Sequence, residues 1–199
     1  MSILRITGAA GFACAALLVL NAGRKGGLVP ETVVTGAVAP FAPLTGLFAV
    51  TGIYLLIRHR SGTLGLVGYL LNSAGLAGAF GIEFTLHYVF PYLPGDTVAG
   101  LVAGGTGKAF LVTGVVLITG VLALGAAALR SRALPAAGVA LYVIGMIPGS
   151  LRSAVPLPVY LVGLVVAAAG IALMAARLWS AQEEGGGAAR IGGAVQASA

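Results

Sequence analysis

The chain has 199 residues, of which 59% are hydrophobic and only 8% are charged. Soluble domains carry roughly 25% charged residues, so this composition excludes an ordinary soluble fold. The formal net charge is +6, but no cluster of Lys and Arg is interleaved with aromatic residues in a polar region, so we expect no nucleic-acid partner.

Charge-free apolar segments recur along the chain at lengths suited to a lipid bilayer. A bilayer core of about 30 Å needs roughly 20 apolar residues of α-helix, and continuous rather than alternating apolar segments favour helices over strands. We expect spans at 6–22, 38–57, 63–83, 107–129, 134–150 and 157–177. The predicted fold class is all-α: a polytopic membrane protein with six transmembrane helices in one bundle, formed by residues 1–179.

The first span, 6–22, has two interpretations. It resembles a signal peptide in length, but only Arg5 precedes its apolar part, and Leu20 occupies position −3 for a cut after Ala22. We therefore favour an uncleaved anchor. Its Cys14 is the only cysteine in the chain, which rules out an intrachain disulfide, and no Cys/His spacing predicts a metal site. We expect neither a metal nor a cofactor.

The positions of the cations predict the orientation of the bundle. If the N-terminus is cytoplasmic, seven arginines share its side, whereas Arg24, Lys25, Arg152 and, depending on its depth, Lys108 lie opposite. Positive residues favour the cytoplasmic side, so we expect both termini in the cytoplasm. The abundance of Arg, Ala, Gly and Val suggests a bacterial plasma (inner) membrane. The polar, glycine-rich residues 180–199 predict a disordered cytoplasmic tail.

The many glycines predict close contacts between helices, because lipid offers no hydrophobic drive between helices and small residues let them approach. Gly100 and Gly104 are four residues apart, as are Gly163 and Ala167. Two interpretations remain open. These faces pack inside one bundle, or they form the interface of a homo- or hetero-oligomer.

A polar stripe follows the expected span 63–83. With about 100° of rotation per residue, Tyr69, Asn72, Glu83 and His87 fall on one face of a helix. A face of this kind is costly in contact with lipid, so we expect it to point into the bundle. Glu83 is the carboxylate that the apolar pattern does not place in a loop or in the tail, which makes it the leading candidate site residue.

Glu83 and His87 are four residues apart, so their side chains can touch. A carboxyl group in an apolar setting can act as a general acid, and the first interpretation is a catalytic pair. The second is a helix end with two interfacial polar residues. Lys108, which opens the next span, is the expected counter-ion of Glu83, unless it extends to the lipid headgroups.

Aromatic residues concentrate beside Glu83, where Phe80, Phe84 and Tyr88 follow one another along the chain. An aromatic belt at the membrane interface explains this concentration. The alternative is a substrate pocket whose ring faces stabilise a cation. In that case these rings would bind substrate together with Tyr69, Asn72 and Lys108.

The segment Gly81-Ile82-Glu83-Phe84, followed by Tyr88 and Pro91, resembles the acid-bearing helix of integral-membrane terpenoid cyclases. The resemblance implies that Glu83 is a proton donor. That family usually has tryptophan before the glutamate, a second acid in a late span and seven spans. This chain has Ile82, no acid between Asp96 and the tail, and six expected spans. Its overall layout resembles small uncharacterised six-span bacterial membrane protein families.

The expected function is the handling of a lipophilic small molecule in a cavity in the outer half of the bundle. The resemblance implies acid-catalysed terpenoid cyclisation, so an enzyme here would be a membrane-bound lyase or isomerase of cyclase type. Two other classes remain open: a small-solute or proton-coupled transporter, and a non-catalytic membrane partner subunit.

Overall fold

The computed structural model describes residues 3–152 and 154–196, with side chains described as far as Ala181. This part of the chain is almost entirely helical and contains no strand. The elements in chain order are α1 (Ile3–Lys25), α2 (Val33–Val38), α3 (Phe41–Tyr88), the 3-10 helix η1 (Phe90–Tyr92), α4 (Gly95–Ala103), α5 (Gly105–Ser131), α6 (Ala136–Gly149) and α7 (Leu157–Gln196). The all-α prediction is confirmed.

Four helical stretches of the described chain are long and apolar enough to cross a membrane: Ile3–Lys25, Val33–Tyr92, Gly105–Ser131 and Leu157–Ala181. These helices indicate a membrane protein. The predicted count of six spans is not confirmed. The expected spans 38–57 and 63–83 fall within the single long stretch Val33–Tyr92, and the expected span 134–150 falls on α6, which has only 14 residues.

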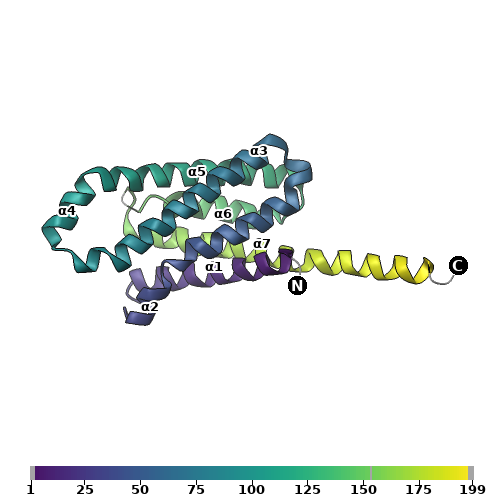
Figure 1. The fold of residues 1–199 in the computed structure, drawn as a ribbon, viewed down its shortest axis with the longest axis horizontal. Helices are drawn as coiled ribbons and strands as arrows, with labels where there is room; N and C mark the ends of the chain where they lie inside the picture. The colour runs from purple at the N-terminus through teal and green to yellow at the C-terminus, as the bar shows by residue number, and fades with distance from the viewer. Residues whose placement is uncertain (1–2, 153, 197–199) are drawn as a thin grey trace.

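Helix α3 bends sharply at Gly62, where φ is 54° and ψ is −153°. Glycine adopts such a conformation without the steric penalty that a Cβ atom imposes. The bend divides α3 into a first arm, 41–61, and a second arm, 63–88, which lie antiparallel (Figure 1). The rings of Tyr54 and Tyr69 stack across the arms with centroids 4.6 Å apart. The turn predicted between the two expected spans is therefore present.

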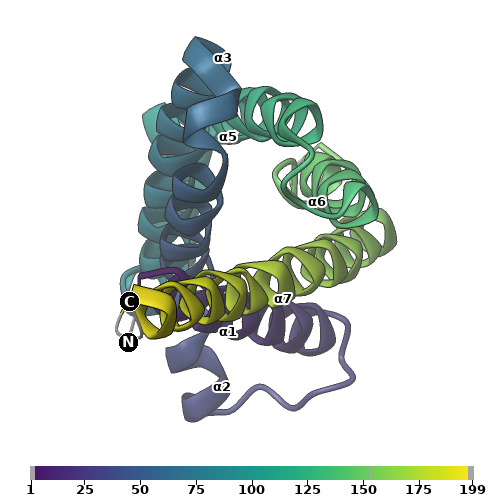
Figure 2. The ribbon, with the colours of Figure 1, turned by 90° about the vertical axis from the view of Figure 1, so that its right-hand side faces the viewer.

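The helices contact their neighbours in a closed order: α1, α3, α5, α6, α7 and back to α1 (Figure 2). Small residues permit the closest approaches. A Cβ atom at Gly75 on α3 would meet the backbone of Leu117 on α5, and one at Gly145 on α6 would meet the backbone of Ala167 on α7. Packing within the bundle thus uses many of the glycines. A Cβ atom placed at Gly100 would have no neighbouring atom within 4 Å.

Two short helices at the same end of the bundle were not expected as separate elements. Thr32 caps α2, because its hydroxyl accepts a hydrogen bond from the Thr35 amide. Gly104, with φ −95° and ψ −140°, separates α4 from α5. Lys108 therefore lies in the first turn of α5, where it is exposed. An interfacial position of Lys108 stays a prediction.

The opposite end of the bundle gathers the N-terminus of α1, the bend of α3 and the connection from α5 to α6 (Figure 1). A groove there is lined by His59, Arg60, Arg132 and Arg177. Arg5 lies near this end as well, with its guanidinium 5.7 Å from the centre of the Trp179 ring. Three of the arginines assigned to one side from the sequence, Arg60, Arg132 and Arg177, are thus neighbours in space.

Helix α7 continues to Gln196 and projects beyond the bundle (Figure 1). Residues 180–196 are thus helical, although the sequence predicts a disordered tail from residue 180. Residues 197–199, which complete the predicted tail, lie outside the described part of the chain. The domain boundary at residue 179 stays a prediction.

Candidate ligand-binding cavity

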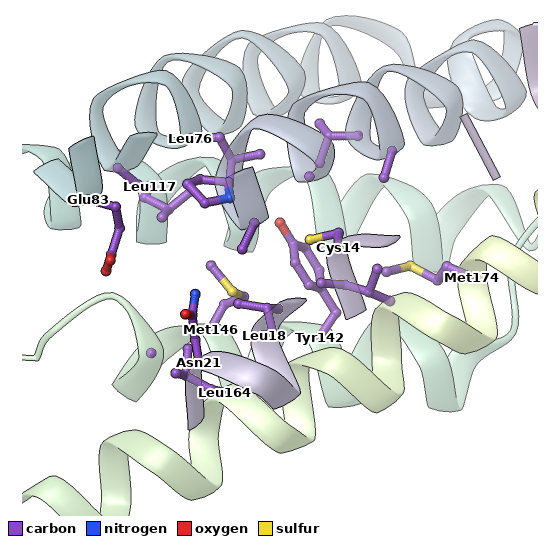
Figure 3. Close-up of a pocket in the computed structure, with 18 of the residues that line it drawn as sticks. Cys14, Leu18, Asn21, Leu76, Glu83, Leu117, Tyr142, Met146, Leu164 and Met174 are labelled. Atoms are coloured by element: carbon purple, nitrogen blue, oxygen red, sulfur yellow. The ribbon is translucent and has the colours of Figure 1, made fainter. Parts of the chain in front are cut away.

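A cavity of about 100 Å³ lies inside the bundle between α1, both arms of α3, and α5, α6 and α7. Most of its lining is aliphatic, sulfur-containing or aromatic. Among the described residues, Lys25 and Glu83 are the only charged side chains that line it. Figure 3 shows Glu83 and Asn21 at one end, with Tyr142 and Met174 farther inside. The cavity is therefore apolar along its length and charged at one end.

The charged end is an ion pair between α1 and the second arm of α3. The Lys25 ammonium donates to Oε1 of Glu83 at 3.0 Å, and the two side chains are 9% and 17% exposed. Lys25 also donates to the hydroxyl of Tyr160 on α7 at 3.1 Å. The counter-ion of Glu83 is thus Lys25 and not the expected Lys108, because α1 rather than α5 presents its cation to this face of α3.

His87 is held one turn beyond Glu83, and its hydrogen bonds assign its tautomer. The Arg24 guanidinium, which can only donate, lies 2.5 Å from Nε2 of His87. Nε2 must therefore accept, and the proton sits on Nδ1, which donates to the backbone carbonyl of Glu83 at 2.8 Å. Both ring nitrogens are occupied in this arrangement. Its role is to fix Arg24 and the end of α3.

Asn72 lies deeper in the bundle and is completely buried. Its amide donates to the Tyr142 hydroxyl at 2.8 Å, and that hydroxyl donates back to Oδ1 at 3.2 Å. The pair joins α3 to α6, and Tyr142 lines the cavity. Asn72 thus supports the cavity wall through Tyr142 rather than contacting Glu83.

Tyr69 belongs to a different contact from Glu83, although the two share a helix face. Its hydroxyl lies 3.4 Å from that of Thr51, and its ring stacks on Tyr54. Both partners belong to the first arm of α3. Tyr69 does not line the cavity. Of the predicted polar stripe, only Glu83 and His87 contact each other among the contacts described, whereas Tyr69 and Asn72 meet other partners.

The aromatic residues beside Glu83 form a row on the outside of α3. Phe80 and Phe84 have ring centroids 6.1 Å apart, and Phe84 and Tyr88 are 4.9 Å apart. Phe84 and Tyr88 are 46% and 38% exposed, and none of the three lines the cavity. This position agrees with an aromatic belt and not with a substrate pocket around Glu83.

A groove of about 320 Å³ adjoins the cavity on the other side of Glu83. It is bounded by the second arm of α3, the start of α5 and the segment 149–152. Ala79, Leu117 and Gly149 line both the groove and the cavity, and so do Glu83 and Tyr160. The Lys25–Glu83–Tyr160 cluster therefore stands between the cavity and the groove.

Sequence reasoning missed Asn21, Lys25 and Tyr160. Asn21 is 4% exposed, and its Nδ2 donates to the carbonyl of Ala39 at 3.1 Å. A signal for two of them was present: Asn21 is an amide inside an apolar span, and Lys25 was assigned to the same end of the bundle as Glu83. No group of three or more His, Cys, Asp or Glu in the described chain could hold a metal ion.

The fold and the cavity together define a helical bundle with helices long and apolar enough to span a membrane and an internal apolar cavity that ends in an ion pair. No protein-family model, curated protein or solved structure matches the chain. The resemblance to integral-membrane terpenoid cyclases around Glu83 therefore stays a prediction.

Proposed function

We propose that the protein is a six-span protein of the bacterial plasma membrane that binds a small lipophilic molecule in the cavity beside Glu83. The observation that carries the proposal is the cavity itself: a space inside the bundle, lined mostly by apolar side chains, that ends in the largely buried Lys25–Glu83 pair. Ligand pockets commonly combine an apolar lining with a few convergent polar groups that fix the orientation of the ligand.

The antiparallel arms of α3 support six crossings. Each arm is long enough for a separate passage, since 20 residues of helix extend about 30 Å. α6 is shorter, at about 21 Å for its 14 residues, but it packs between α5 and α7 and returns the chain to the end where α7 begins (Figure 1). An even number of crossings, such as six, places both ends of the chain on the same side of the membrane.

The arginine-rich end is proposed to face the cytoplasm. It contains the connection between the arms of α3, with Arg58 and Arg60, and the connection from α5 to α6, with Arg130 and Arg132. Short connections rich in arginine favour the cytoplasmic side. The Lys25–Glu83 pair then lies toward the outer surface.

The geometry supports binding more strongly than acid catalysis. An ionised Glu83 paired with Lys25 has no proton to donate, so terpenoid cyclisation would require that Lys25 first move away. The cavity of about 100 Å³ is also smaller than the roughly 300–1,000 Å³ of common ligand pockets. If cyclisation nevertheless takes place, Glu83→Gln abolishes it; turnover equal to that of the parent protein would eliminate this chemistry.

The test is mass spectrometry of small molecules retained by the purified protein and by two matched variants. Ala79→Leu fills the cavity next to Glu83, whereas Ala140→Leu makes the same change at an exposed position of α6 outside it. A lipophilic compound enriched with the parent and with Ala140→Leu, but depleted with Ala79→Leu, supports the proposal. Equal retention by all three proteins contradicts it.

A further inference from the structure

We infer that the ligand of this cavity carries a hydroxyl group, which donates a hydrogen bond to Asn21 Oδ1 or Glu83 Oε2 while the apolar remainder occupies the cavity. The inference rests on the proposed function of the cavity. The observation behind the inference is that several polar groups at the Lys25–Glu83 end of the cavity can form further hydrogen bonds.

The first unused group is the side-chain carbonyl of Asn21. Nδ2 must face the Ala39 carbonyl, to which it donates at 3.1 Å. Oδ1 therefore points the other way, where it is buried and has no hydrogen-bond partner. Buried polar groups in folded proteins are nearly always hydrogen-bonded. Asn21 lines the cavity, so this acceptor is available to a ligand.

The second unused group is Oε2 of Glu83. Oε1 accepts from Lys25, whereas Oε2 is buried without a hydrogen-bond partner. His87 Nδ1 lies 3.5 Å from Oε2, but its proton is directed to the Glu83 backbone carbonyl at 2.8 Å. Figure 3 shows the Glu83 carboxylate and the Asn21 amide pointing into the same end of the cavity. Two acceptors without a hydrogen-bond partner, Asn21 Oδ1 and Glu83 Oε2, therefore lie at this end of the cavity.

Donors are also left over at this end. Lys25 has three N–H groups and uses two, on Glu83 and Tyr160. The Tyr160 hydroxyl accepts from Lys25, so its own proton remains available. A group that both donates and accepts can therefore satisfy this end of the cavity.

A hydroxyl group donates one hydrogen bond, to either Asn21 Oδ1 or Glu83 Oε2, and it can accept one from Lys25 or Tyr160. A ketone or an ether only accepts, so it would leave both buried oxygens without a partner. A carboxylate would be repelled by Glu83, and an ammonium group would place a second cation beside Lys25. The ligand class that matches is a neutral alcohol with a compact apolar body.

The experiment compares cyclohexanol with cyclohexanone, which share a ring and differ in their ability to donate. Saturation-transfer NMR titrations on the purified protein give a dissociation constant for each probe. Ala79→Leu supplies the background from partitioning into detergent. We expect cyclohexanol to bind at least about tenfold more tightly, because the ketone cannot satisfy the buried acceptors.

The outcomes separate the inference from the proposed function. If both probes bind above the Ala79→Leu background with equal affinity, or the ketone binds more tightly, the inference is wrong and the cavity remains a ligand site. If neither probe exceeds that background, the proposed function fails, and the inference fails with it.

Two variants test whether Glu83 and Asn21 cause the preference for the alcohol over the ketone. Glu83→Gln keeps an oxygen for Lys25 and places an amide N–H₂ where Oε2 stood, so the alcohol preference should fall toward equality. Asn21→Leu removes the other acceptor at similar size and should reduce the preference as well. If the alcohol-to-ketone ratio is unchanged in both variants, the preference arises elsewhere and the assignment is overturned.

Discussion

At the residue scale, the proposed ligand site depends on the Lys25–Glu83 pair. Both side chains are largely buried, and each compensates the charge of the other. Glu83 could be found from the sequence, because a carboxylate next to a charge-free apolar run is unusual. Lys25 could not be assigned as its partner, because the two residues are distant in the chain and only helix packing brings α1 against the second arm of α3.

Removing one member of this pair should destabilise the protein. Lys25→Met leaves a buried carboxylate without compensation, which we expect to cost about 3–5 kcal/mol of unfolding free energy. Lys108→Met, at an exposed position in the first turn of α5, should change stability little. Thermal unfolding in detergent gives the comparison. Equal effects of the two substitutions would show that Lys25 has no special role.

Adding Glu83→Leu to Lys25→Met should restore part of the lost stability, since no unpaired charge then remains in the bundle. The two single substitutions and the double substitution form a thermodynamic cycle that measures the coupling. Simple additivity of the two single effects would argue against a direct ion pair.

At the element scale, the sequence predicted the positions of most long helices but not the short helices between them. Apolar runs located α1, α5 and the start of α7 well, because bilayer-length apolar helices have a strong compositional signal. The short helices α2 and α4 were missed, since their start signals, Thr32 and the Pro94-Gly95 pair, stand among other turn-forming residues. The arms of α3 were expected as separate spans, and the bend at Gly62 lies in the turn predicted between them.

The close packing of α3 on α5 can be tested by a matched pair of substitutions on α3. Gly75→Ala places a methyl group against the backbone of Leu117, which should destabilise the protein by about 1–3 kcal/mol. Gly81→Ala adds the same group where no atom lies within 4 Å, so it should be neutral or slightly stabilising. Unfolding measurements that rank Gly81→Ala as the more damaging change would contradict this packing.

At the scale of the whole molecule, the predicted grouping of cations agrees with the bundle, because Arg60, Arg132 and Arg177 line one groove. The internal cavity could not be predicted from the sequence. Its lining comes from several helices, and an apolar pattern marks a buried face without showing whether that face is filled.

The proposed topology can be tested by labelling single cysteines in intact cells, in a Cys14→Ala background. An impermeant maleimide should label Val33→Cys and Asp96→Cys, which lie at the end proposed to face outward. Thr63→Cys and Ala136→Cys, next to the arginine-rich connections, should react only after the membrane is opened. Labelling of Thr63→Cys in intact cells would contradict two crossings by α3 in the proposed orientation.

The most direct test for a lipophilic ligand in the cavity beside Glu83 is an experimental density map of the protein purified with its native lipids. We expect non-protein density inside the cavity, in contact with Asn21 Oδ1 or Glu83 Oε2, while Lys25 remains bound to Oε1 of Glu83. A cavity filled by the protein's own side chains, or Lys25 turned away from Glu83, would contradict it.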